Sequence, residues 1–169
     1  IVEKSIEMAY SDSCFPIKLL HGHTQTLKNN DFIIFPSSLR LGVKEGDENQ
    51  KYSCPLVQAS PFIVRSVLSL ENKILIPFLD FSRGDQEVIK NLREMANKMG
   101  FNAASGQQAA LAGLKAQQRF EAGKLAAGDR WLKEIEESGR LGVVVISRAY
   151  MAQDAGANLG IAEKLAQLG

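Results

Sequence analysis

The chain contains two cysteines, Cys14 and Cys54, and each lies close to a proline. Cys14 is two residues before Pro16, and Cys54 is followed directly by Pro55. A thiol held by a proline-stiffened turn at the end of a strand or the mouth of a helix is well placed to present sulfur to a metal cluster or a substrate. Both cysteines are therefore candidate metal ligands. Plain packing is the alternative, because cysteine is among the most buried residue types.

Two histidines and a lysine follow the first cysteine. His21 and His23 are two positions apart, so on a helix they point in different directions and cannot both bind one metal ion. We therefore expect a structural role for them, such as bonding a backbone carbonyl or orienting a cysteine loop. Lys18 lies one helical turn from Cys14, where it either favours the thiolate and balances a cluster's negative charge or is an ordinary solvated lysine.

Arg148 and Asp154 form a third candidate site, in a polar turn after an apolar run. The planar guanidinium of arginine suits both carboxylates and phosphates. An internal Arg148–Asp154 ion pair would order the turn, and this is the interpretation that we favour. The alternative is that the two residues bind a cofactor or substrate phosphate, in which case Arg148 points to solvent when the site is empty.

The composition is that of an ordinary globular protein, with 45% hydrophobic and 23% charged residues in a chain of 169. The net charge of +1 gives no electrostatic support for binding nucleic acid or anionic lipid. No apolar run reaches the roughly 18 residues that a membrane span needs, and the first residues do not resemble a signal peptide. We therefore expect reduced thiols in a cytoplasmic protein whose partners are small molecules and other proteins.

Buried-strand and helix patterns alternate along the chain, which predicts an α/β fold with a layered, mainly parallel sheet and flanking helices. Ligands in such folds lie outside the carboxyl ends of the strands. No internal repeat emerges from the pattern. The predicted strands are 31–36, 73–79 and 141–147, with a strand edge at 54–57. The predicted helices are 14–28, 85–99 and 131–139, together with a helix capped by Ser60, a helix capped by Ser105 that reaches about residue 125, and a helix that begins at about residue 159.

The long helical stretch in the middle of the chain suggests a domain boundary near Gly139. Residues 1–139 would form an α/β domain that carries both Cys-Pro motifs, and residues 140–169 would begin a second α/β unit. The chain starts without an initiator methionine and ends where a helix would lead into another strand. We therefore expect it to be an excised fragment.

Four ordered motifs make the chain resemble the acyl-CoA dehydratase activase-related family, within the wider group of 2-hydroxyacyl-CoA dehydratase subunits and double-cubane-cluster proteins. The resemblance implies that Cys14 and Cys54 bind an iron–sulfur cluster. It also implies that electrons reach this cluster from an ATP-driven activator with an actin-like nucleotide fold. The motifs are Asp12–His23, Asp31–Pro36, Tyr52–Gln58, and Ser147–Tyr150 followed by Asp154, Gly156 and Asn158.

The chain departs from the family pattern in three ways. It has two cysteines where a cluster site in this group uses at least three, and it has Ser147–Tyr150 where relatives tend to have Gly-Arg-Pro-Tyr. It also lacks the actin-like ATPase motifs, so ATP would act only through a domain outside this chain. We expect a chain prepared in air to contain no cluster, because two thiolates leave the iron under-coordinated.

The sequence thus predicts a fragment of an iron–sulfur protein that takes part in ATP-driven, low-potential electron transfer to a small substrate of the acyl-CoA type. Its protein partner would be the actin-like ATPase activator domain. If Cys14 and Cys54 share a cluster, their sulfurs should lie within roughly 7 Å of each other. The alternative is a non-catalytic module that docks an ATPase domain and has purely structural cysteines.

Overall fold

The computed structural model describes residues 1–9, 13–41 and 52–168. The chain divides into two compact units, Ile1–Arg119 and Phe120–Gly169. The first unit is an α/β structure, as predicted. Its elements in chain order are α1 (Val2–Met8), α2 (Phe15–Thr26), β1 (Ile33–Ile34), β2 (Ser37–Arg40), α3 (Pro55–Val67), β3 (Ile74–Leu75), β4 (Phe78–Asp80), the 3-10 helix η1 (Phe81–Arg83), α4 (Asp85–Lys98) and the start of α5 (Ala103–Ser138).

The strands pair in parallel, β1 with β3 and β2 with β4. Along the chain, Pro36 separates β1 from β2, and Pro77 separates β3 from β4, because proline has no N–H to donate to a ladder. Backbone bonds continue across the interruption: the Phe35 N–H donates to the Leu75 carbonyl at 2.9 Å, and the Ser37 N–H donates to the Pro77 carbonyl at 3.0 Å. The four short strands therefore behave as one parallel ribbon of two chain segments.

The first unit contains a repeat that the sequence pattern did not reveal. In each copy a cysteine caps a proline-initiated helix, and the helix leads into a strand interrupted by a proline. Arg40 follows Cys14 by 26 residues, and Asp80 follows Cys54 by 26 residues. We call residues 14–40 the Cys14 half and residues 54–80 the Cys54 half.

The two halves share one hydrophobic core. Leu20 of α2 packs against this core from one helix, and Val64 of α3, which is fully buried, lies within it. Burial of these apolar side chains drives the helices onto the strands. The buried core residues are Ile33, Val64, Leu70 and Ile74, with Leu20, Phe35, Leu68 and Ile76 packed against them.

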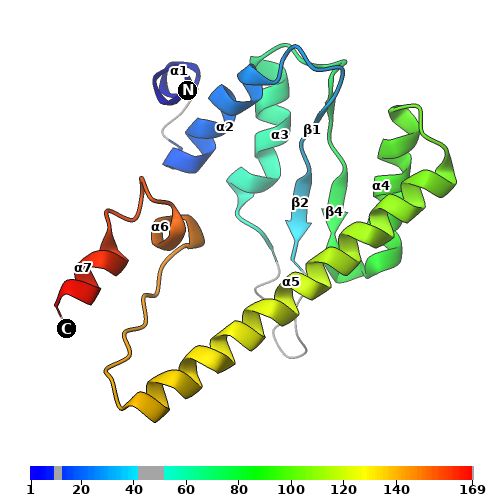
Figure 1. Cartoon of the computed structure of the whole chain (residues 1–169). Helices are drawn as coiled ribbons and strands as arrows, with labels where there is room; N and C mark the ends of the chain where they lie inside the picture. The colour runs from blue at the N-terminus through cyan, green and yellow to red at the C-terminus, as the bar shows by residue number, and fades with distance from the viewer. Residues whose placement is uncertain (10–12, 42–51, 169) are drawn as a thin grey trace. The chain divides into compact units, whose positions relative to one another are not determined.

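Each helix runs opposite to the strand that follows it, because a short connection joins the end of the helix to the start of the strand. Figure 1 shows α3 beginning near the tip of the β2 arrow and ending near the start of β1. The N-terminus of the helix therefore lies on the side where the parallel strands end. This is the side on which ligands bind in parallel α/β folds.

Two local predictions in the first unit are wrong. Residues 54–57 are not a strand edge, because Cys54 caps α3 and Pro55 opens it. Ser60 and Pro61 lie inside this helix, where the Ser60 hydroxyl donates to the carbonyl of Leu56. Both Cys-Pro and Ser-Pro are helix-start signals, and the first of them sets the boundary.

The predicted pair of helices at 105–125 and 131–139 is one continuous helix, α5. Alanine, glutamine, leucine and lysine are strong helix formers, and together they outweigh the glycines within the run. Its first turn is capped by Asn102, whose side-chain carbonyl accepts the Ser105 N–H at 2.8 Å. Ser105 is therefore inside the helix rather than at its cap.

The second unit contains the end of α5, followed by α6 (Ala149–Gln153) and α7 (Ile161–Gln167). The strand predicted at 141–147 is wrong: this segment forms no ladder, and Val144 and Ile146 are 81% and 93% exposed. An apolar run becomes a buried strand only where a neighbouring strand offers hydrogen bonds, and none does so in the part of the chain that is described. None of the described helices is both long and apolar enough to span a membrane.

Candidate functional site

Cys14 and Cys54 occupy equivalent positions at the starts of α2 and α3. Both are N-cap residues with similar backbone angles, φ and ψ being −60° and 150° at Cys14 and −53° and 133° at Cys54. The Cys14 carbonyl accepts the Ile17 N–H at 3.0 Å, and the Cys54 carbonyl accepts the Val57 N–H at 2.9 Å. Neither side chain makes a capping bond, and both thiols are exposed.

The position of these thiols suits metal binding in its chemistry. The first backbone N–H groups of a helix attract negative charge, and the thiolate is the form of cysteine that binds metals. Two thiolates are fewer than an iron–sulfur cluster needs. Among the described residues no group of three or more histidine, cysteine, aspartate or glutamate side chains converges as a metal site. The donors thus fit a cluster in type, but the described residues do not supply a complete ligand set.

The residues before Cys54 are tied to the end of β2. The Ser53 N–H donates to the Leu39 carbonyl at 2.9 Å, and the Ser53 hydroxyl donates to the Ser38 carbonyl. Gln58, in the first turns of α3, donates to the Ser53 carbonyl at 2.7 Å. Cys54 therefore follows a residue, Ser53, that is hydrogen-bonded both to β2 and to α3.

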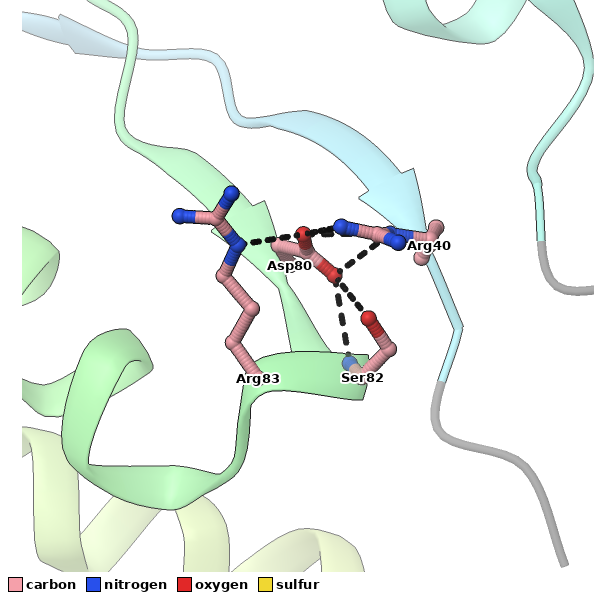
Figure 2. A network of polar contacts seen from close by, with 4 residues as sticks. All are labelled: Arg40, Asp80, Ser82 and Arg83. Atoms are coloured by element: carbon pink, nitrogen blue, oxygen red, sulfur yellow. Dashed lines mark hydrogen bonds and ion pairs between the residues drawn. The ribbon is translucent and has the colours of Figure 1, made fainter.

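An ion pair between Arg40 and Asp80 joins the ends of β2 and β4 (Figure 2). Arg40 Nε lies 3.1 Å from each carboxylate oxygen, and Nη2 lies 2.5 Å from Oδ2. Ser82 donates to Oδ1 through its N–H at 3.2 Å and its hydroxyl at 2.7 Å. Arg83 Nε is 3.3 Å from Oδ2, and its side chain is 64% exposed. This network links the two segments of the ribbon at the carboxyl ends of β2 and β4.

The Asp80 carboxylate is 1% exposed and stays ionised in this network. Burial alone would raise the pKa of Asp80, but hydrogen bonds from Arg40 and Ser82 outweigh burial and hold the pKa below its usual value. The same bond to Asp80 raises the pKa of Arg40. The pair is therefore charged on both sides at neutral pH.

The sequence pattern does not reveal this network. The glycines and charged residues of 40–50 predict a solvated loop that begins at Arg40, and no motif marks Asp80. The structure places Arg40 at the end of β2, whereas residues 42–51 of that predicted loop lie outside the described residues. A signal was available in Asp80, which directly follows the predicted buried strand 73–79 at the edge where parallel sheets bind ligands.

The histidines take different positions on α2. His21 is 3% exposed, and its Nδ1 lies 3.3 Å from the Ile17 carbonyl, which is the kind of structural bond that was predicted. Its Nε2 has no hydrogen-bond partner among the described residues. His23 is exposed at the next position but one. The two side chains do not meet at a common point.

Arg148 and Asp154 are the N-cap and C-cap of α6. Asp154 Oδ1 accepts the N–H groups of Gly156 and Ala157, each at 2.9 Å. Aspartate often bonds to the backbone just ahead of it in this way. No ion pair joins Arg148 to Asp154 in the described part of the chain, so the internal pair that was favoured is not seen. Their assignment as cofactor-binding residues stays a prediction.

Comparison with known proteins gives one match. The family model described as "CoA enzyme activase uncharacterised domain" matches residues 1–169. No curated protein and no solved structure matches the chain. The match covers every motif on which the resemblance to activase-related proteins rested. The chain therefore belongs to the CoA enzyme activase uncharacterised domain family.

Proposed function

We propose that this chain is part of an iron–sulfur protein related to 2-hydroxyacyl-CoA dehydratase activases. In this proposal Cys14 and Cys54 are cluster ligands, and the protein takes part in ATP-driven, low-potential electron transfer to a small substrate of the acyl-CoA type. An actin-like ATPase domain outside this chain supplies the nucleotide chemistry, in the cytoplasm. Membership of the CoA enzyme activase family supports the relation to activases.

One observation carries the cluster proposal: both cysteines are exposed N-caps of equivalent helices in a repeated unit. A cysteine with a packing role would be buried, because it then acts as a small apolar side chain in the core. Two equivalent exposed thiols at helix N-termini are instead accessible to a metal and lie where negative charge is favoured. The cluster would supply one-electron chemistry when bound, and these residues would hold it.

The test is anaerobic reconstitution of the chain with iron and sulfide, with dithiothreitol present to supply the remaining thiolates. We expect iron and sulfide to be retained after desalting by the wild type and lost in Cys14→Ser and in Cys54→Ser. The matched control is Ser13→Ala, which changes the neighbour of Cys14 and keeps both thiols. Full retention of iron and sulfide by both serine variants would overturn the assignment.

Arg148 and Asp154 enter the proposal as residues for a substrate phosphate. Arg148 forms no ion pair with the described residues, which leaves its planar fork available to an oxyanion. Changing Arg148→Lys should weaken the binding of coenzyme A without altering the iron content. Unaltered affinity for coenzyme A would leave Arg148 a structural residue.

A second candidate function, docking of an ATPase domain, is favoured by the outer side of α3. Leu56, Phe62 and Ile63 are 37–45% exposed there, and Arg65 is the one charged residue of this helix. A hollow of about 620 Å³ is lined by Phe62, Ile63, Ser66 and Val67. Phe62→Ser should abolish binding of an actin-like ATPase domain and leave reconstituted iron unchanged if docking is the function. Unchanged binding would exclude this surface.

A further inference from the structure

We propose that Arg40 and Asp80 are positioning residues for Cys54. The ion pair does not touch the thiol. It fixes the end of β2, and the segment that delivers Cys54 to the N-terminus of α3 is bonded to that end. The inference rests on the proposed function for what the thiol binds, and on contacts within the first unit for how the thiol is held.

The first step is the fixing of Arg40. Its guanidinium bonds both oxygens of a buried carboxylate, so its orientation is determined by Asp80. Asp80 is itself held by two bonds from Ser82 and by the backbone pairing of β4 with β2. Bonds between charged groups are about twice as strong as neutral ones. Arg40 is thus held at this edge by charged hydrogen bonds.

The second step leads from Arg40 to the cysteine. Arg40 pairs with Tyr52 through an antiparallel backbone bridge, and its guanidinium lies 5.4 Å from the centre of the Tyr52 ring. The next residue, Ser53, bonds to the carbonyls of Ser38 and Leu39. Cys54 follows immediately. Tyr52 and Ser53, the two residues before Cys54, therefore both contact β2.

The third step joins the start of α3 to the same strand. The Ser37 hydroxyl donates to the Gln58 carbonyl at 3.0 Å, and the Gln58 side chain donates to the Ser53 carbonyl. Cys54 lies between these two attachments. Loss of the ion pair frees the end of β2, and with it the segment that sets the N-cap conformation of Cys54.

The chain provides an internal control. Cys14 has the same N-cap geometry and the same helix start, but no contact among the described residues connects it to Arg40 or Asp80. A change that acts through the ion pair should therefore loosen the start of α3 and leave the start of α2 unchanged. A change that destabilises the whole unit would loosen both.

The experiment is amide hydrogen exchange of the full chain, measured by NMR. The reporters are the Val57 and Gln58 N–H groups, which donate to the Cys54 carbonyl, and the Ile17 and Lys18 N–H groups, which donate to the Cys14 carbonyl. In Asp80→Asn we expect exchange at the Cys54 reporters to accelerate about tenfold or more while the Cys14 reporters stay within about twofold. Equal acceleration at both, or none at either, would overturn the proposal.

Two further variants keep the test decisive. Ser82→Ala removes a donor to Asp80 and leaves the bonds from Arg40, so it should change the Cys54 reporters far less than Asp80→Asn. If Asp80→Asn does not fold, Tyr52→Ala replaces it, because Tyr52 is 64% exposed and its ring contacts Arg40. It should accelerate the same two reporters by about threefold. No acceleration there would contradict the proposal.

This test and the test of the cluster fail independently. A wild-type chain that retains no iron, with the exchange result as expected, would remove the cluster and leave the positioning of Cys54. Retained iron with unchanged exchange would support the cluster and remove the positioning of Cys54.

Discussion

The Cys14 half and the Cys54 half have the same plan and different surroundings. Each has a cysteine at a helix N-cap, a proline in the first turn and a proline-interrupted strand. The helix of the Cys14 half is covered by α1, which approaches it at Gly22. The helix of the Cys54 half exposes apolar side chains on its outer side and is tied at its start to β2. Equivalent thiols therefore lie in different surroundings.

This difference shows which features come from the repeat and which come from its neighbours. The exposure and N-cap geometry of the thiols follow from the repeated pattern of cysteine, proline and helix. The attachment of Cys54 arises because the strand of one half lies beside the helix start of the other. Arg40 and Asp80 each lie 26 residues after the cysteine of their half, and their opposite charges link the two halves into one unit.

The largest change in the free energy of unfolding should come from substitutions in the core that the two halves share. Ile33 and Ile74 are each 5% exposed and stand opposite each other in the ladder. Ile33→Ala and Ile74→Ala should each lower the free energy of unfolding by about 2–5 kcal/mol, because each leaves a cavity. Urea denaturation measures this. The control is Ile34→Ala at a 48% exposed position, where the change should be small. A large difference between the two buried variants would contradict an equivalent role.

A smaller effect should separate the halves at α1. A side chain added at Gly22 would collide with the Ser5 hydroxyl and come within 3.0 Å of the Ile1 carbonyl. Gly22→Ala should therefore cost about 1–3 kcal/mol of stability. Gly113→Ala is the matched control, because that position in α5 is open and alanine should stabilise the helix by about 0.5–1 kcal/mol. If Gly22→Ala were neutral in urea denaturation, α1 would not cover the Cys14 half as described.

The smallest effect expected is a pH dependence that belongs to the junction of the halves. Because the pKa of Asp80 is lower in the folded chain, its contribution to stability is fully present above the unfolded value, about 3.9, and is lost as the pH falls through the folded value. The stability difference between the wild type and Asp80→Asn should thus be constant near neutral pH and shrink in acid. Denaturation midpoints at several pH values measure it. A difference that grows in acid would give the wrong sign.

Much of the first unit could be predicted from its sequence. The helices at 14–28 and 85–99 and the strands at 31–36 and 73–79 correspond to α2, α4 and the interrupted strands. Their apolar periodicity is strong and their ends carry clear signals. The α3 start was misplaced because two Xaa-Pro signals compete, and the local pattern does not say which one the fold uses.

The remaining features depend on partners distant in the sequence. Arg40 resembles any solvated arginine until β4 places Asp80 beside it. The run at 141–147 has a strand composition, but strand formation requires a neighbour with free backbone groups, and the composition does not provide one. The repeat was hidden for a similar reason, since its halves share the order of cysteine, proline, helix and proline-interrupted strand but few residues at matching positions. Even the prolines are offset by one residue: Pro16 is two residues after Cys14, whereas Pro55 directly follows Cys54.

In the proposed function the two halves present Cys14 and Cys54 to one shared metal site. Anaerobic titration with cadmium distinguishes one shared site from two separate sites, because thiolate ligation gives an ultraviolet charge-transfer band for each bound ion. We predict that the wild type binds one cadmium ion per chain tightly and that Cys14→Ser and Cys54→Ser each lose this tight site completely. Two independent ions per chain, with each variant retaining half of the absorbance, would contradict a shared site.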